Sequence, residues 1–254
     1  MNTSGTPGQA LDQTDGAEVS AREEVEREKN ALQEQARKLL DENAIASLEQ
    51  TWRAIQAITN NRFAEARGAL AEALAKLGAA RNDHPEVASV PVTLKVEVVD
   101  TAPRGREQVL DLADEAAIAL AKKIYPEARE ALEQLRSEIR VRTVNLPLQT
   151  FQDYLNNAAR SLDNSMHTQA KEALERAPAS LIAAERIVPI PLILAREAMR
   201  QIQERQCSEK TQGLAFLRRA EQELQRAKDL GYATNSERFT ELSNQLKQLR
   251  KQLR

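Results

Sequence analysis

Three related octapeptides decide the fold: FAEARGAL at residues 63–70, YPEAREAL at 125–132 and HTQAKEAL at 167–174. Each has alanine at its fourth position and leucine at its eighth. Residues four positions apart lie on the same face of an α-helix. The small alanine lets a second helix approach closely, and the leucine fills the remaining gap. The spacing therefore predicts helices that pack on other helices.

The sequence around the octapeptides predicts a repeated helical hairpin. A helical stretch and a short polar turn precede each copy, with the turns at residues 60–61, 122–123 and 163–165. A fainter copy, TQGLAFL at 211–217, follows a turn at 208–210. Such recurrence is typical of antiparallel helix pairs, but intervals of 62, 42 and 43 residues favour a compact, repeat-derived bundle over a regular solenoid. The matching leucines, which we expect to be buried, are Leu70, Leu132, Leu174 and Leu217.

Two segments have the alternation of β-strands. In VPVTLKVEVVD at residues 90–100, Val92, Leu94, Val96 and Val98 alternate with the residues that follow them, and residues 139–144 alternate likewise. One strand is not stable alone, so we predict that the two pair into a small two-stranded ribbon against the helices. The segments VNLPL at 144–148 and VPIPL at 188–192 predict extended chain leading into helices near Pro147 and Pro191. Pro178 falls inside the helix after His167 and predicts a kink there.

The ends of the chain complete a mainly α fold. Residues 1–18 are polar and are expected to be disordered, and residues 19–254 are expected to form one helical domain. Within it we predict an N-terminal helix at 19–43, a hairpin body at 44–230 and a C-terminal helix at 236–254. Gly231 is placed for a left-handed helix cap. The last helix carries a ladder of Leu242, Leu246, Leu249 and Leu253 that suits docking on the body or pairing with another subunit.

The charge pattern argues against nucleic acid as a partner, and the hydrophobic pattern argues against a membrane span. The chain has 36 basic and 38 acidic residues, mixed along its length. Its one basic cluster is Lys247, Lys251 and Arg250 with Arg254, which we interpret as a solvated helix end favoured by the helix dipole. No apolar run approaches the roughly 18 residues that span a bilayer. The first residues have no signal-peptide pattern, so we expect a cytoplasmic protein, or a periplasmic one if a leader has been trimmed.

The chain offers no set of residues typical of catalysis. His84 and His167 are far apart, and we interpret both as solvated loop residues. Cys207 is the only cysteine, so a disulfide, a zinc site and a cysteine–histidine pair are not expected. Asp111 and Glu115 are interpreted as solvated charges on a helix face. We therefore predict no enzyme activity, no catalytic residue, no cofactor and no metal.

Most aromatic residues lie on apolar helix stripes, and core packing is the function we expect of them. Phe63 and Tyr125 occupy equivalent repeat positions. The others interpreted in this way are Trp52, Phe151, Tyr154, Phe216 and Phe239.

Several landmarks together resemble the YfdX family of bacterial proteins. They are EARGAL in the first hairpin, LRSEIRVRTVNLPLQTFQDYL at 135–155, IPLILAREA at 190–198 and LGY at 230–232. The resemblance extends over about residues 44–249. It implies a mostly helical fold, an association with bacterial heat and acid tolerance, and a chaperone-like or small-molecule-binding role. The family has no established catalytic residues, and this chain departs from many of its members in lacking a signal segment and in carrying Pro178.

These observations together predict a non-enzymatic stress-protection protein. We expect it to hold partly unfolded client proteins in apolar grooves between helices, and to form a homo-oligomer. Two alternatives stay open: a helical-repeat scaffold or adaptor that binds one protein partner, and a sensor that binds a small molecule. The pattern by itself identifies no residue of a binding site.

Overall fold

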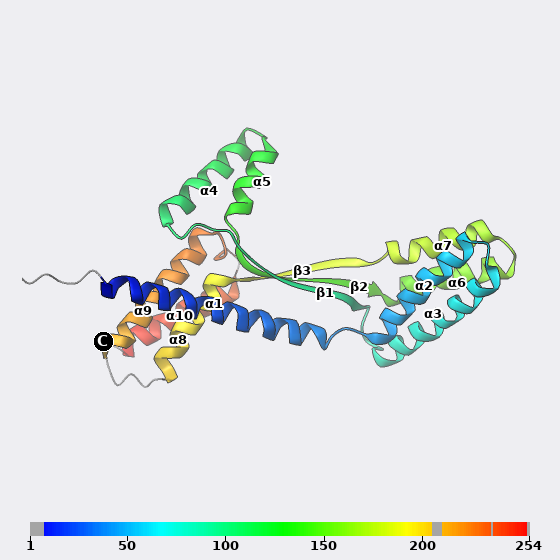
Figure 1. Cartoon of the computed structure of the whole chain (residues 1–254), viewed down its shortest axis with the longest axis horizontal. Coiled ribbons are helices and arrows are strands. Elements are labelled where there is room, and N and C mark those ends of the chain that lie inside the picture. Colours follow the sequence, from blue (N-terminus) through cyan, green and yellow to red (C-terminus); the bar gives the residue numbers. More distant parts are fainter. Residues whose placement is uncertain (1–7, 205–209, 235, 253–254) are drawn as a thin grey trace, which may run out of the picture. The chain divides into compact units, whose positions relative to one another are not determined.

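The computed structural model describes residues 8–204, 210–234 and 236–252, which form ten helices and three strands (Figure 1). In chain order these are α1 (Gly8–Arg37), α2 (Glu42–Thr59), α3 (Phe63–Asp83), β1 (Ser89–Asp100), α4 (Arg106–Ala121), α5 (Tyr125–Gln134), β2 (Ser137–Pro147), α6 (Leu148–Asp163), α7 (His167–Ala179), β3 (Ile182–Pro189), α8 (Ile190–Glu204), α9 (Lys210–Asp229) and α10 (Glu237–Gln252). The predicted mainly α fold of antiparallel hairpins is confirmed. Helix α1 begins at Gly8, earlier than the sequence predicted.

The chain forms two compact units. Unit 1 consists of residues 1–32, 96–140 and 187–254, and unit 2 consists of residues 33–95 and 141–186. Unit 2 therefore holds α2, α3, α6 and α7, and unit 1 holds α4, α5, α8, α9, α10 and most of α1. All three strands run from one unit into the other.

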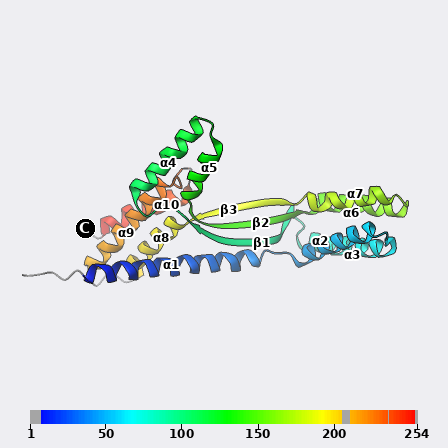
Figure 2. The same ribbon diagram turned by 45° about the horizontal axis from the view of Figure 1, so that its top comes forward.

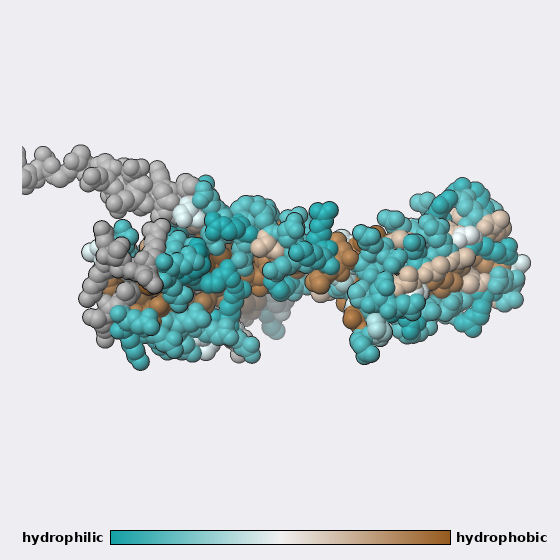
Figure 3. Space-filling model, turned by 90° about the horizontal axis from the view of Figure 1, so that it is seen from below, coloured by the Kyte–Doolittle hydropathy of each residue, from teal (hydrophilic) through white to brown (hydrophobic). Residues whose placement is uncertain are grey.

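Unit 2 is a bundle of two hairpins. Helix α3 packs on α6 and α2 packs on α7, and Figure 2 separates the hairpin α6–α7 from α2–α3 below it. The largest side chains of its core are fully buried, among them Leu77, Phe151 and Leu155. In the space-filling view of Figure 3, hydrophilic residues cover most of this bundle, at the right, and hydrophobic residues show in a band between them. Trp52, which was predicted to be core, is half exposed because it lies beside the buried stripe of α2.

The sheet has three strands in the order β1-β2-β3, so the prediction of two strands was wrong by one. Neighbouring strands run in opposite directions, because β1 and β3 lead along the chain from unit 2 to unit 1 and β2 leads from unit 1 to unit 2. The sequence missed β3 because its first six residues are exposed, and without a buried face it has no apolar alternation. Along β1 the predicted buried face fades, from Val92, which is buried, to Val98, which is exposed.

Unit 1 has its own core, formed by α8, α9 and α10. Leu242 and Leu249 of the predicted leucine ladder are buried there and Leu246 is partly buried, whereas Leu253 lies outside the described residues. The ladder thus docks on its own chain, and it no longer supports the expectation of an oligomer.

Pro147, Pro191 and Gly231 have the geometry that the sequence predicted. Helices α6 and α8 begin beside Pro147 and Pro191, at the ends of extended segments. Gly231 has the left-handed φ of 85°. Pro178 lies inside α7, which ends at the next residue.

Candidate functional site

Four turns of the chain share one geometry, which makes the repeat positions comparable. Asn61, Lys123 and Ser165 have left-handed φ values of 57°, 60° and 59°, as Gly231 does. The residue that follows each left-handed residue donates its backbone N–H to the carbonyl oxygen of the residue five positions before itself, with N···O distances of 2.8–2.9 Å. These are helix caps of the Schellman type. The fourth cap lies at residues 230–232, after α9, while the predicted fourth turn begins at Ser208, outside the described residues.

In each of the first three hairpins, buried alanines line the inner seam, which is the surface along which the two helices of the hairpin pack together. Ala66, Ala128 and Ala170 follow the left-handed residue by five positions, and all three are buried. On the preceding helix the equivalent alanines Ala54, Ala116 and Ala158 are buried as well. The close approach predicted from the octapeptides therefore occurs within all three hairpins.

The outer faces of the hairpins differ. Nine positions after the left-handed residue, Leu70 and Leu174 are only 2% and 0% exposed, but Leu132 is 48% exposed. Three positions before it, Ile58 and Leu162 are buried, but Leu120 is again 48% exposed. The prediction that Leu132 is buried was wrong. In unit 2 the two hairpins cover each other, whereas no other hairpin covers this face of α4–α5 in the part of unit 1 that the structure describes.

The aromatic position of the repeat shows the same contrast. In unit 2, Phe63 and His167 stack with ring centroids 3.6 Å apart and planes inclined by 9°. His167 is therefore a partly buried packing residue and not the solvated loop residue that was predicted. Tyr125 occupies the equivalent position on α5 and is 61% exposed, so its predicted place in a core was also wrong.

The exposed apolar residues of this hairpin define a surface that we call the α4–α5 outer face. On α4, residues that recur every three to four positions lie on one side of the helix. The α4–α5 outer face consists of exposed residues of both helices and one partly buried residue, Ala113. The exposed members are Leu110, Ala117 and Leu120 on α4 and Tyr125 and Leu132 on α5. The hairpin that carries it is drawn in green in Figure 1.

A cavity of about 420 Å³ lies elsewhere in unit 1, beside α9. It is lined by Arg104, Arg106, Val109, Gln222, Glu223, Gln225, Arg226 and Asp229. Two of its arginines already have acceptors. Arg106 donates to Asp229 at 2.8 Å and lowers the pKa of that carboxyl, and Arg226 donates to the carbonyls of Ala102 and Pro103 at 3.1 and 2.6 Å. Burial raises the pKa of Glu223. The polar groups of this cavity mainly bind the start of α4 to α9.

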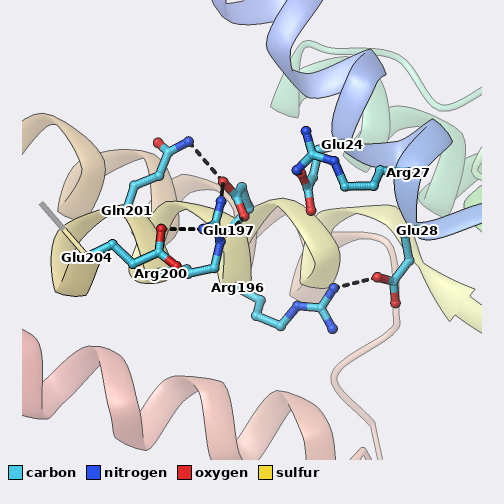
Figure 4. A network of polar contacts seen from close by, with 8 residues as sticks. All are labelled: Glu24, Arg27, Glu28, Arg196, Glu197, Arg200, Gln201 and Glu204. Carbon is cyan, nitrogen blue, oxygen red and sulfur yellow. Dashed lines mark hydrogen bonds and ion pairs between the residues drawn. The ribbon is translucent and has the colours of Figure 1, made fainter. Parts of the chain in front are cut away.

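A network of charged residues joins α1 to α8 within unit 1 (Figure 4). Arg196 donates to Glu28 at 2.7 Å, while Glu197 accepts from Arg200 at 2.6 Å and from Gln201 at 3.0 Å. Burial alone would raise the pKa of Glu197, but the bonds and charge of Arg200 and its neighbours outweigh burial and lower it. The Arg196–Glu28 pair stabilises the contact between the two helices, whereas the bonds of Glu197 lie within α8. Ionised groups with such partners are poorly suited to proton transfer.

The remaining candidates from the sequence do not converge on one site. His84 bonds Asp41 at 3.0 Å, and Asp41 also caps α2. Asp111 and Glu115 are exposed on α4, and Cys207 lies outside the described residues. In the described ranges, no three histidine, cysteine or carboxylate side chains are grouped as metal ligands. No described helix has both the length and the apolar character needed to cross a membrane.

A family match decides what the chain is related to. The model of the YfdX protein family matches residues 47–186, more than half of the sequence. The chain belongs to the YfdX family. A solved structure of Salmonella Typhi YfdX is similar to it at 15% sequence identity, over 59% of this chain and 93% of that one, with a TM-score of 0.41. A search of curated proteins gives no match. The YfdX match includes all three octapeptides, and with them the α4–α5 outer face.

Proposed function

We propose that this YfdX protein is a non-enzymatic stress-protection protein that holds partly unfolded clients on the α4–α5 outer face. The observation that carries the proposal is the exposure of Leu120 and Leu132, since the equivalent residues of both other hairpins are buried. Contiguous exposed apolar side chains on a folded protein mark a surface for another molecule.

The shape of the face favours an apolar helical or extended segment as its ligand. Ala113 and Ala117 are small, and Leu110 and Leu120 stand on either side of them along α4. An amphipathic helix binds to such a surface by placing its apolar side chains over the small residues. Exposed charges of both signs, such as Lys122 and Glu127, surround the face as the polar rim surrounds a protein interface.

The test is protection of a heat-labile enzyme from aggregation, followed by light scattering. The wild-type chain is expected to suppress scattering at stoichiometric amounts, and a Leu120→Lys/Leu132→Lys variant is expected to lose most of that effect. Ile118→Lys is the matched control, because Ile118 is 54% exposed and lies about 160° around α4 from Leu120, at about 100° per residue. It is expected to protect as the wild type does.

Failure of the wild-type chain to suppress scattering would overturn the client-holding function. An adaptor for one partner would give that result together with a single protein that co-purifies and depends on Leu120 and Leu132. Far-ultraviolet circular dichroism of each variant shows whether the helices are retained.

A further inference from the structure

We infer that the α4–α5 outer face pairs with the same face of a second copy of this chain. The two hairpins would form a four-helix bundle that repeats the one inside unit 2. This inference rests on the proposed function and deepens it, because it names the molecule that covers the client surface when no client is bound.

The packing inside unit 2 already has the symmetry that a dimer needs. The first helix of each hairpin contacts the second helix of the other, as α2 contacts α7 and α6 contacts α3. Phe63 and His167 occupy equivalent positions and stack directly on one another. A residue that meets its own equivalent lies on the two-fold axis of an isologous interface. Two identical hairpins paired in this way close into a dimer.

The α4–α5 hairpin has the residues that this pairing requires. Leu120 and Leu132 occupy the positions that are buried between the hairpins of unit 2. Placed as in unit 2, α4 of one copy lies along α5 of the other, and the two Tyr125 rings stack at the axis. Ala113 and Ala117 leave room for the helix of the second copy to approach closely.

A polar contact of unit 2 also has its counterpart on this hairpin. Arg67 donates to the carbonyl oxygen of Leu162 on the facing hairpin at 2.8 Å. Arg129 occupies the position of Arg67, is exposed, and takes part in no hydrogen bond or ion pair among the described residues. In the dimer it would donate to the Leu120 carbonyl of the second copy. One hairpin therefore carries both the donor and the acceptor, which favours a second copy over an unrelated partner.

The first test is the mass of the full chain, measured by sedimentation over a range of concentrations. The wild type and the Ile118→Lys control are expected to reach twice the monomer mass, and the Leu120→Lys/Leu132→Lys variant is expected to remain monomeric. Arg129→Ala is expected to weaken the dimer about tenfold or more, since it removes a charged hydrogen bond from each half. A wild type that stays monomeric at all concentrations, or a dimer that these changes leave intact, would overturn the inference.

Cross-linking keeps the inference testable if the lysine variant fails to fold. In a Cys207→Ser background, Tyr125→Cys is expected to form a disulfide-linked dimer under mild oxidation, because the two cysteines face each other at the axis. Ile118→Cys is the control and is expected not to cross-link. The absence of cross-linking at residue 125 would count against the pairing.

The two proposals fail separately. A monomeric wild type that still suppresses aggregation would overturn the dimer and leave the client-holding function in place. A dimer with the predicted dependence on Leu120 and Leu132 that protects no client would confirm the pairing and overturn the function.

Discussion

The hydroxyl group of Tyr232 completes a buried polar cluster at the start of β2. It donates to Oε2 of Glu138 at 2.8 Å and accepts from the N–H of Ser137 at 3.0 Å. Arg140 donates to the other carboxylate oxygen of Glu138 at 2.6 Å, and the Glu138 side chain is only 4% exposed. Burial, together with the bond to Glu138, raises the pKa of Tyr232, so the phenol remains a donor at any physiological pH.

Tyr232→Phe is expected to lower the free energy of unfolding by about 1.5–3 kcal/mol, the usual contribution of a hydrogen bond to a charged group. The reason is that a buried carboxylate loses one of its donors. Urea unfolding followed by circular dichroism measures the change. Tyr154→Phe is the control, because Tyr154 is partly buried in unit 2 and its hydroxyl has no hydrogen bond among the described residues. Equal costs for the two variants would show that the cluster adds no stability.

The turn is the element on which the repeat depends. All four turns use a left-handed residue, but glycine occupies that position only at Gly231. The other three side chains carry the steric cost of a positive φ, about 1–2 kcal/mol for an ordinary L-residue. At Gly231 an added Cβ would meet no atom within 4 Å, so the cost of replacing this glycine is one of backbone conformation alone.

Lys123→Gly is therefore expected to stabilise the chain by up to about 1 kcal/mol, after the greater freedom of glycine in the unfolded chain is deducted. Gly231→Ala is expected to destabilise it by about 1 kcal/mol for the reverse reason. Thermal unfolding of both variants beside the wild type measures the two shifts. Shifts of the same sign would contradict the shared geometry of the turns.

At the scale of the whole molecule, the two units differ in the burial of the leucine that ends the octapeptide. Leu174→Ala removes a fully buried side chain from unit 2 and is expected to cost about 2–5 kcal/mol. Leu132→Ala removes a half-exposed side chain at the equivalent position in unit 1 and is expected to cost less than about 1 kcal/mol in dilute protein. Urea unfolding at low concentration measures both values. A similar cost for the two variants would mean that the α4–α5 outer face is covered within a single chain.

The costs of Leu132→Ala and Leu174→Ala can also be compared at increasing protein concentration. If two copies pair through this face, the cost of Leu132→Ala is expected to grow as the wild-type dimer is populated, since only the wild type then gains stability from association. The cost of Leu174→Ala is expected to stay constant.

Much of the fold could be predicted because it is encoded locally. Alanines and leucines at helical spacing define the inner seam of each hairpin, and a three-residue turn returns the chain upon itself. The burial of Ala66, Ala128 and Ala170 follows from this pattern alone. Strand β3 could not be predicted, because most of its side chains are exposed and its place in the sheet comes from backbone hydrogen bonds to another part of the chain.

The sequence by itself determined the helices, the caps and the pairing of each helix with its neighbour, since these depend on residues a few positions apart. Only the tertiary structure decided which outer faces are covered. Leu132 and Leu174 end nearly identical octapeptides, yet one is exposed and the other is buried. The difference depends on whether a second hairpin, distant in sequence, packs against that face. The spacing of residues within the octapeptide does not determine whether such a hairpin is present.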